Sequence, residues 1–223
     1  MAFSIIIPSR NATNLVACVK AVRAAGETAS IIVVDDGVDW NQCDFDRVYP
    51  QFHIVSGQKP FVFARNCNIG IRAAGEDDVV LLNDDALLEG DRGFSILALA
   101  STDRDYGVIG ATTNLTGQVL QQRRCNQGIV RQVPHIAFVC VYIPRRTLNT
   151  VGLLDERYCE GYGCEDRDYC ESVNAAGLKV GVSDWCYVDH GSLTSSFRGA
   201  PTASGDFSRN FAIFRKKWPE AKL

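Results

Sequence analysis

The chain has 223 residues, of which 46% are apolar and 22% charged, and its formal net charge is −3 at neutral pH. This length fits one domain that can bury a full core. The negative balance gives no general attraction for nucleic acid or anionic lipid, so an anionic ligand would need a local site. The longest apolar runs, such as 136–143, are too short to span a bilayer. We therefore expect no nucleic-acid partner and no transmembrane segment.

The cysteines bear on the cellular compartment. There are nine of them, an odd number, and no two are spaced as in CxxC. The first residues form a strand-length apolar run without basic flanks, which is unlike a signal peptide. These observations favour reduced thiols in a cytoplasmic protein and argue against a zinc site.

Apolar runs and helical periodicities alternate along the chain. The expected strands are 4–8, 31–34, 52–55, 79–82, 108–110, 138–143 and 179–182. The expected helices are 14–25, 64–74, 94–100, 166–176 and 207–218. This rhythm predicts a single α/β domain over 1–223, with a mostly parallel central sheet flanked by helices. We expect 1–110 to form a nucleotide-binding half and 111–223 an acceptor-binding half.

Two common phosphate-binding signatures are absent from the sequence. No GxGxxG follows the first strand, which argues against a dinucleotide cofactor, and no GxxxxGK[ST] is present, which excludes a P-loop. The first strand instead leads into Pro8-Ser9-Arg10-Asn11.

Polar residues follow three of the expected strands: Pro8, Ser9 and Arg10; Asp35 and Asp36; and Asn83, Asp84 and Asp85. In a doubly wound sheet these strand ends would line one crevice. Adjacent carboxylates repel each other unless a cation lies between them, so a divalent ion and a diphosphate would suit this edge. We expect Asp36 to accept from a base N–H, Asp84 to hold a ribose hydroxyl and Asp85 to hold the metal. The alternative is that each acid only forms a turn.

At these residues the sequence resembles family 2 glycosyltransferases of the Rossmann-like GT-A fold. The resemblance rests on SIIIPS at 4–9, IVVDDG at 32–37, ARN at 64–66 and LLNDD at 81–85. It continues through VGLLDE at 151–156, GYGCEDRD at 161–168 and FRKKW at 214–218, which are similar to rhamnosyltransferase-like members. The motifs cover nearly the whole chain but do not indicate the sugar. One departure is Asn83, where many members carry Asp.

The resemblance implies an enzyme that uses a nucleotide-diphosphate sugar together with Mn²⁺ or Mg²⁺. The donor would be of the UDP or dTDP type, and the acceptor a hydroxyl of a glycan, polysaccharide or lipid-linked molecule. Arg65 would add a charge-assisted contact to phosphate or base, although a surface arginine explains it as well. By the same pattern His190 would contact the metal or phosphate. The alternative for His190 is a hydrogen-bonded structural residue.

The acids at 165–168 follow a Gly-Tyr-Gly loop and begin an expected helix. The partial positive charge of a helix N-terminus favours ionised carboxylates, so capping alone explains one of them. By the family pattern Asp166 resembles the general base that takes the proton of the acceptor hydroxyl, with Glu165 as the second candidate. One base without a second nucleophile suggests direct displacement with inversion.

Two other function classes remain open from the sequence. A sugar nucleotidyltransferase would need a glycine-rich first loop, and none is present. A non-catalytic carbohydrate- or partner-binding module would need none of the retained acids Asp84, Asp85 and Asp166. For the enzyme, the expected location is cytoplasmic, or peripheral to a membrane through the acceptor.

Overall fold

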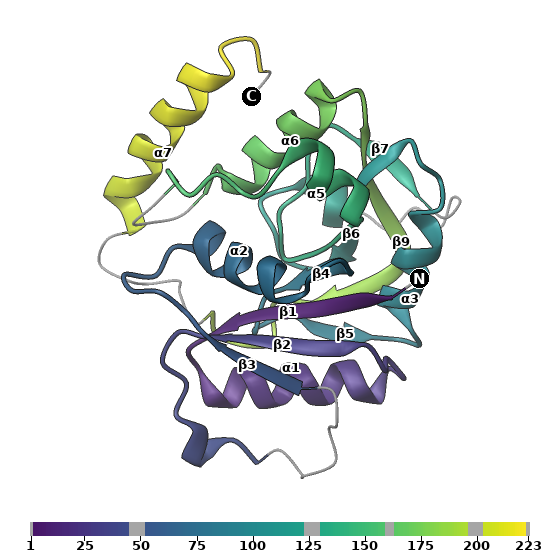
Figure 1. The fold of residues 1–223 in the computed structure, drawn as a ribbon, viewed down its shortest axis with the longest axis vertical. Helices are drawn as coiled ribbons and strands as arrows, with labels where there is room; N and C mark the ends of the chain where they lie inside the picture. The colour runs from purple at the N-terminus through teal and green to yellow at the C-terminus, as the bar shows by residue number, and fades with distance from the viewer. Residues whose placement is uncertain (1, 45–51, 123–129, 159–162, 196–202, 222–223) are drawn as a thin grey trace.

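The structure is a computed structural model that describes residues 2–44, 52–122, 130–158, 163–195 and 203–221, with the side chains of 203–206 left aside. Figure 1 shows one central sheet between helices. Its strands are β1 (Phe3–Ser9), β2 (Ser30–Asp35), β3 (Phe52–Ser56), β4 (Asp78–Leu82), β5 (Leu87–Glu89), β6 (Tyr106–Thr113), β7 (Arg131–Val133), β8 (Cys140–Ile143) and β9 (Lys179–Asp189). The helices are α1 (Ala12–Ala24), α2 (Phe63–Ala73), α3 (Gly93–Ala100), α4 (Val119–Gln122), α5 (Arg145–Val151), α6 (Glu165–Ala175) and α7 (Ala203–Lys217), and the 3₁₀ turn η1 covers Trp40–Gln42.

The strands lie in the order β3-β2-β1-β4-β8-β6-β9-β5, and β7 pairs with β9 outside this path. The stretch β3-β2-β1-β4 is parallel throughout, as is the pair β6–β9. β8 runs antiparallel to both of its neighbours, and β5 and β7 run antiparallel to β9. The first half is therefore a parallel layer, and β8 joins it to a mixed second half in one continuous sheet.

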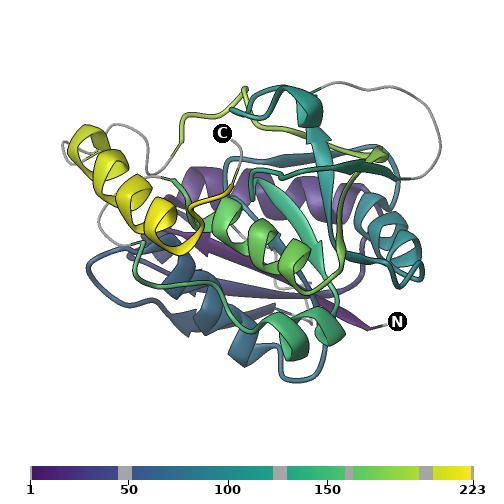
Figure 2. The ribbon, with the colours of Figure 1, turned by 90° about the horizontal axis from the view of Figure 1, so that it is seen from above.

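Alternating strand residues build a core on each face of the sheet. Ile5 and Ile7 of β1 face α1 and α3, whereas Ile6 between them faces α2 and α6. Figures 1 and 2 show α1 and α3 on one face and α2, α5 and α6 on the other. Apolar residues on both faces are the reason that these strands read as continuous hydrophobic runs.

The α/β class and the flanking helices are confirmed. The parallel arrangement is less extensive than expected, with four parallel and four antiparallel pairings among the described residues. The reason lies between β6 and β8, where the described residues 114–122 and 130–139 hold no long helix that would cross the sheet and return the chain in parallel. The short elements β5, β7, α4 and α5 were not expected from the sequence.

A helix needs both sufficient length and sufficient apolarity to cross a bilayer. No helix in the described part of the chain combines the two well enough to cross a membrane.

Candidate active site

Four strands end at one edge of the sheet and bring distant residues together. Ser9 closes β1 opposite Asp35 of β2, and the Ser9 carbonyl accepts from the Asp36 amide at 2.7 Å. The Ser9 hydroxyl donates to Oδ2 of Asp84, beyond the end of β4, at 2.6 Å. Because β9 runs antiparallel to β5, its last residue Asp189 pairs with Leu87, just past the same turn. The expected crevice at the strand ends is thus formed from both halves of the chain.

A tight turn after β4 aims its two carboxylates in different directions. The Ala86 amide donates to the Asn83 carbonyl at 3.1 Å, and the Asn83 amide donates to Val139 at 3.0 Å. Beneath the turn the Cys18 thiol contacts the carbonyl of Ala86 at 3.5 Å. Burial, and then the nearby carboxylates, raise the pKa of this thiol. The thiol therefore stays protonated and can donate its hydrogen to the Ala86 carbonyl.

Asp85 and His190 form a buried pair at this edge. Oδ1 of Asp85 lies 3.1 Å from Nε2 of His190, and both side chains are almost fully buried. Nδ1 of His190 lies 2.7 Å from the Leu115 carbonyl, and the His190 amide donates to Oδ1 of Asn114 at 2.8 Å. A carbonyl can only accept, so Nδ1 carries a proton, and Nε2 faces the Asp85 carboxylate across a distance that a second proton or a cation can bridge.

This arrangement suits a divalent cation. A lone pair on Nε2 facing a carboxylate oxygen is favourable only with a proton or a cation between them. Adjacent ligands of an octahedral Mg²⁺, at about 2.0–2.1 Å from the ion, are roughly 2.9 Å apart, close to the observed separation. No cluster of three or more His, Cys, Asp or Glu ligands exists among the described residues. Phosphate oxygens and water would complete the coordination shell.

Asp36 lies at the end of β2 with its carboxylate buried. It pairs with Nζ of Lys59 at 2.8 Å, and Nδ2 of Asn66 approaches its other oxygen at 3.4 Å. Oδ1 of Asn66 accepts from the Gln58 amide at 3.2 Å. Asp36 therefore has a fixed orientation and retains lone pairs for a further donor. Asp35, in contrast, is used in its own turn, where it accepts from the amides of residues 37 and 38.

The other predicted donor-binding residues occupy less similar environments. Pro8 is buried inside β1, paired with Val34, so it shapes the strand end. Arg65 on α2 points its Nε toward Oε2 of Glu156 at 3.5 Å, which ties it to the loop after α5. Asn83 is half-buried in the turn, and Arg10 is exposed.

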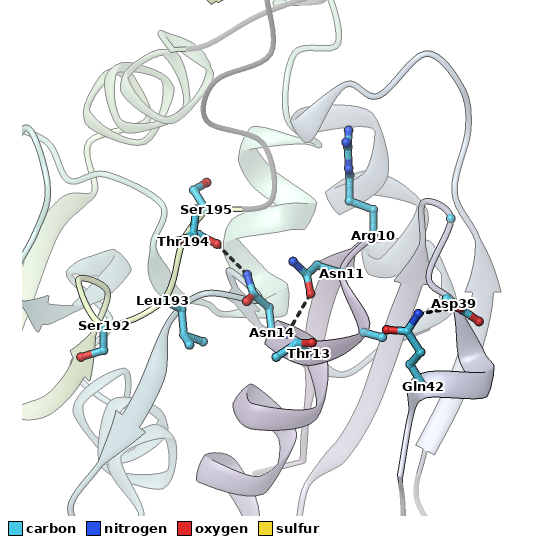
Figure 3. Close-up of a pocket in the computed structure, with 12 residues that line it drawn as sticks. Arg10, Asn11, Thr13, Asn14, Asp39, Gln42, Ser192, Leu193, Thr194 and Ser195 are labelled. Atoms are coloured by element: carbon cyan, nitrogen blue, oxygen red, sulfur yellow. Dashed lines mark hydrogen bonds between the residues drawn. The ribbon is translucent and has the colours of Figure 1, made fainter.

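Arg10 lines an open polar cavity of about 730 Å³, shown in Figure 3. Its walls are the first turn of α1, the loop after β2 and the segment 192–195 that follows His190. Asn11 caps α1 by accepting from the Asn14 amide at 3.1 Å, and Nδ2 of Asn14 donates to the Thr194 carbonyl at 2.9 Å. This bond anchors the segment after His190 to α1, next to the crevice.

Glu165 and Asp166 lie half-buried at the start of α6. The Asp166 carboxylate accepts from the Arg167 amide at 2.7 Å and from the amide of Phe138. Phe138 immediately precedes Val139, whose carbonyl accepts from the turn after β4, so Asp166 lies near the same end of β4 as Asp85. Burial raises the pKa of both acids, and the neighbouring Asp166 raises that of Glu165 further. Both are therefore disposed to hold a proton.

The third acid of the cluster is structural. Oδ1 of Asp168 accepts from the Tyr158 hydroxyl at 3.0 Å and from Nε1 of Trp218 at 2.8 Å. Its Oδ2 pairs with Nζ of Lys217 at 2.8 Å. Asp168 thus joins α6 to α7. Gly161 and Tyr162 of the preceding loop lie outside the described residues.

Sequence reasoning assigned no role to three residues of the site. They are Lys59 and Asn66, which orient Asp36, and Glu156, which holds Arg65. Asn66 and Glu156 stand in two of the motifs that carry the resemblance, so the motifs contained a signal. No motif includes Lys59, and its pairing with Asp36 depends on the conformation of the loop that carries it.

An α/β sheet with a carboxylate-rich crevice at its strand ends is the architecture of the GT-A nucleotide-sugar enzymes. The sequence model described as "Glycosyl transferase family 2" matches residues 4–150. The chain therefore belongs to glycosyl transferase family 2. His190 and Asp166 lie beyond the matched residues.

Among solved structures, the chain is similar to one described as "Crystal structure of GalNAc-T7 with UDP, GalNAc and Mn2+". The TM-score is 0.70 at 15% sequence identity, over 99% of this chain and 51% of that one. The chain thus spans about half the length of that protein, and the likeness shows the GT-A fold. The comparison with curated proteins found no match.

Proposed function

We propose that this glycosyltransferase moves a sugar from a UDP- or dTDP-type donor to a hydroxyl of a glycan, polysaccharide or lipid-linked acceptor, with inversion and with a bound Mn²⁺ or Mg²⁺. The observation that carries the proposal is the buried Asp85–His190 pair, in which Oδ1 of Asp85 and Nε2 of His190 lie 3.1 Å apart. The GalNAc-T7 structure, with UDP and Mn²⁺ in its title, supports the same chemistry.

The donor would lie along the strand ends. Asp85 and His190 would hold the cation, which when bound neutralises the charge that develops on the departing diphosphate. Asp84, which accepts a hydrogen bond from Ser9, would also accept from a ribose hydroxyl. Asp36, oriented by Lys59, would accept from the imino N–H of uracil or thymine, a donor that adenine lacks.

Asp166 would act on the acceptor. Its carboxylate takes the proton of the acceptor hydroxyl while that oxygen bonds to the anomeric carbon. The bond from the anomeric carbon to the diphosphate breaks at the same time, and its electron pair leaves with the diphosphate. One displacement from the opposite face inverts the anomeric configuration.

The test is titration calorimetry of UDP with and without Mn²⁺. We expect Mn²⁺ to strengthen UDP binding to the wild type, and Asp85→Ala and His190→Ala each to abolish this metal-dependent gain. His53→Ala is the matched control, because His53 is exposed on β3 and should behave as wild type. Equal Mn²⁺-dependent affinity in Asp85→Ala would refute the metal assignment.

The same titration separates the nucleobases. UDP and dTDP should bind more tightly than ADP, whose base has no imino N–H, and tighter binding of ADP would contradict the role of Asp36. Binding of sugars without any nucleotide would favour the non-catalytic module. The cytoplasmic location, free or peripheral to a membrane, stays a prediction.

A further inference from the structure

The turn that leads into α6 has an unusual backbone. Gly163 has φ of +96°, and Cys164, the residue before the helix, has φ of +79°. A left-handed conformation costs little for glycine but is unfavourable for cysteine. Cys164 also provides no side-chain cap for the helix. The Gly163 amide donates to Glu165 within the turn, and contacts from elsewhere would add to this local support.

Helix α7 supplies such a contact. Asn210 is fully buried, and its Nδ2 donates to the Gly163 carbonyl at 3.2 Å. Phe207, one turn earlier, lies so close to Gly163 that an added Cβ would approach its ring to 3.3 Å. Oδ1 of Asn210 has no hydrogen-bond partner among the described residues. An unpaired buried carbonyl oxygen costs free energy, so the bond from Nδ2 to Gly163 is the favourable contact of this amide.

Helix α7 and the residue directly after it make further contacts with α6. Arg167 stacks over the Phe214 ring at 5.1 Å, and Trp218 and Lys217 bind Asp168. Figure 2 shows α7 beside α6. Contacts with α7 therefore flank Glu165 and Asp166. Asn210 binds Gly163, just before the two acids, and Lys217 and Trp218 bind Asp168, just after them.

We propose that Asn210 is a positioning residue for the acceptor-activating end of α6. By fixing the Gly163 carbonyl, it sets the left-handed turn from which the Asp166 carboxylate is directed toward the end of β4. This inference rests on the proposed role of Asp166 as the base. A displacement of about 1 Å in such a group can cost roughly 10²-fold in rate.

The experiment compares Asn210→Leu, which keeps the volume but loses the donor, with the wild type. We expect kcat to fall roughly 10- to 10²-fold, while the affinity for UDP and Mn²⁺ is unchanged. The matched control is Asn174→Leu, since Asn174 on α6 also donates one 3.2 Å bond to a backbone carbonyl, that of Pro134. The control should keep the wild-type kcat.

Hydrogen exchange gives a readout that needs no catalysis. The Asp168 amide donates to the Cys164 carbonyl at 2.8 Å and reports the first turn of α6. We expect Asn210→Leu to exchange this amide faster than Asn174→Leu does. If Asn210→Leu does not fold, Asn210→Asp replaces it, because a carboxylate keeps the shape and cannot donate when ionised.

The outcomes separate this inference from the proposed function. Wild-type kcat and unchanged exchange in the Asn210 variants would overturn the positioning role, whatever Asp166 does. Faster exchange with wild-type kcat would also overturn it, because the turn would then matter only for stability. If Asp166→Asn transfers sugar as fast as wild type, the base assignment fails instead.

Discussion

The two neighbouring acids at the start of α6 differ in what surrounds them. Asp166 accepts from the Phe138 amide beside the end of β4, whereas Glu165 accepts from the Gly163 amide and lies close enough to raise the pKa of Cys67 on α2. Position therefore favours Asp166 as the residue that meets an acceptor at the strand ends. Glu165 is directed toward the space between α2 and α6.

Replacing Asp166 by Asn keeps the shape of the side chain but removes the proton acceptor. We expect transfer to fall by roughly 10²–10⁴-fold, the usual contribution of a positioned base. Donor binding should persist, because the nucleotide residues belong to other elements. Glu165→Gln is the control and should be milder. The reverse order of effects would exchange the two roles, and a retained anomeric configuration in the product would rule out a single displacement.

The pH dependence follows from burial. The pKa of Glu165 is raised to about 8 and that of Asp166 is also raised, so the folded state holds their protons more tightly than the unfolded chain does. Their contribution to stability is present below the ordinary carboxyl pKa and is lost as pH rises through the raised values. Glu165→Gln should thus become more stable relative to wild type as pH rises toward about 8. Urea denaturation at several pH values measures this, and an opposite trend would contradict it.

The same shift affects the rate, since a base must lose its proton before it can act. Transfer should increase with pH through the raised pKa of Asp166. A profile that is flat above the ordinary aspartate range would show that bound donor or metal restores the usual pKa.

At the scale of elements, one carboxylate makes several of the contacts that hold the end of α7. The buried Asp168 accepts hydrogen bonds from Tyr158 and Trp218 and forms an ion pair with Lys217. Two of these three partners lie at the end of α7 or directly after it. Asp168→Ala should lower the free energy of unfolding by about 2–4 kcal/mol, because charge-assisted bonds are lost and their donors stay partly buried. Limited proteolysis should then cut α7 from the chain sooner.

A suitable control for this variant is Asp155→Ala. Asp155 pairs with the exposed Arg157 and, at 3.4 Å, with Lys217. Exposed pairs contribute about 0–1 kcal/mol. Equal losses in the two variants would show that Asp168 has no special part in holding α7.

Most elements could be predicted because each buries a long apolar pattern. β5 and β7 have three residues apiece, too few for a period to be recognised. The meeting of Asp85 and His190 could be anticipated only from a resemblance, since nothing local indicates that β9 returns beside β5. The contacts of Lys59 and Asn210 could not be anticipated at all, because they join loops and helices through single side chains.

For the whole molecule, the two halves are joined by more than a shared sheet. Nδ2 of Asn68 on α2 donates to the Leu154 carbonyl and to Glu156, each at 2.9 Å, and its Oδ1 accepts from the Leu154 amide at 3.0 Å. A buried amide thus binds both backbone groups of one residue across the junction. The expectation of one domain over 1–223, with halves at 1–110 and 111–223, implies that both unfold together.

Tryptophan fluorescence can test this expectation. Trp40 reports the first half and Trp218 the second, so variants that keep only one of them can follow each half in urea. Asn68→Ala should lower the free energy of unfolding by about 2–4 kcal/mol, because Leu154 would lose its partners in a buried place. Both signals should shift by the same amount. A shift of the Trp218 signal alone would indicate two independent units.

The order of the strands also has a consequence for biosynthesis. β9 pairs with β5, β6 and β7, yet of the described strands it is the last to leave the ribosome. Until then those three strands present open edges, the feature that recruits other chains into aggregates. His190 emerges directly after β9, so a nascent chain gains the second residue of the proposed metal site only when its edges can close. The nascent chain would therefore become able to close its sheet and to bind its donor at the same step of translation.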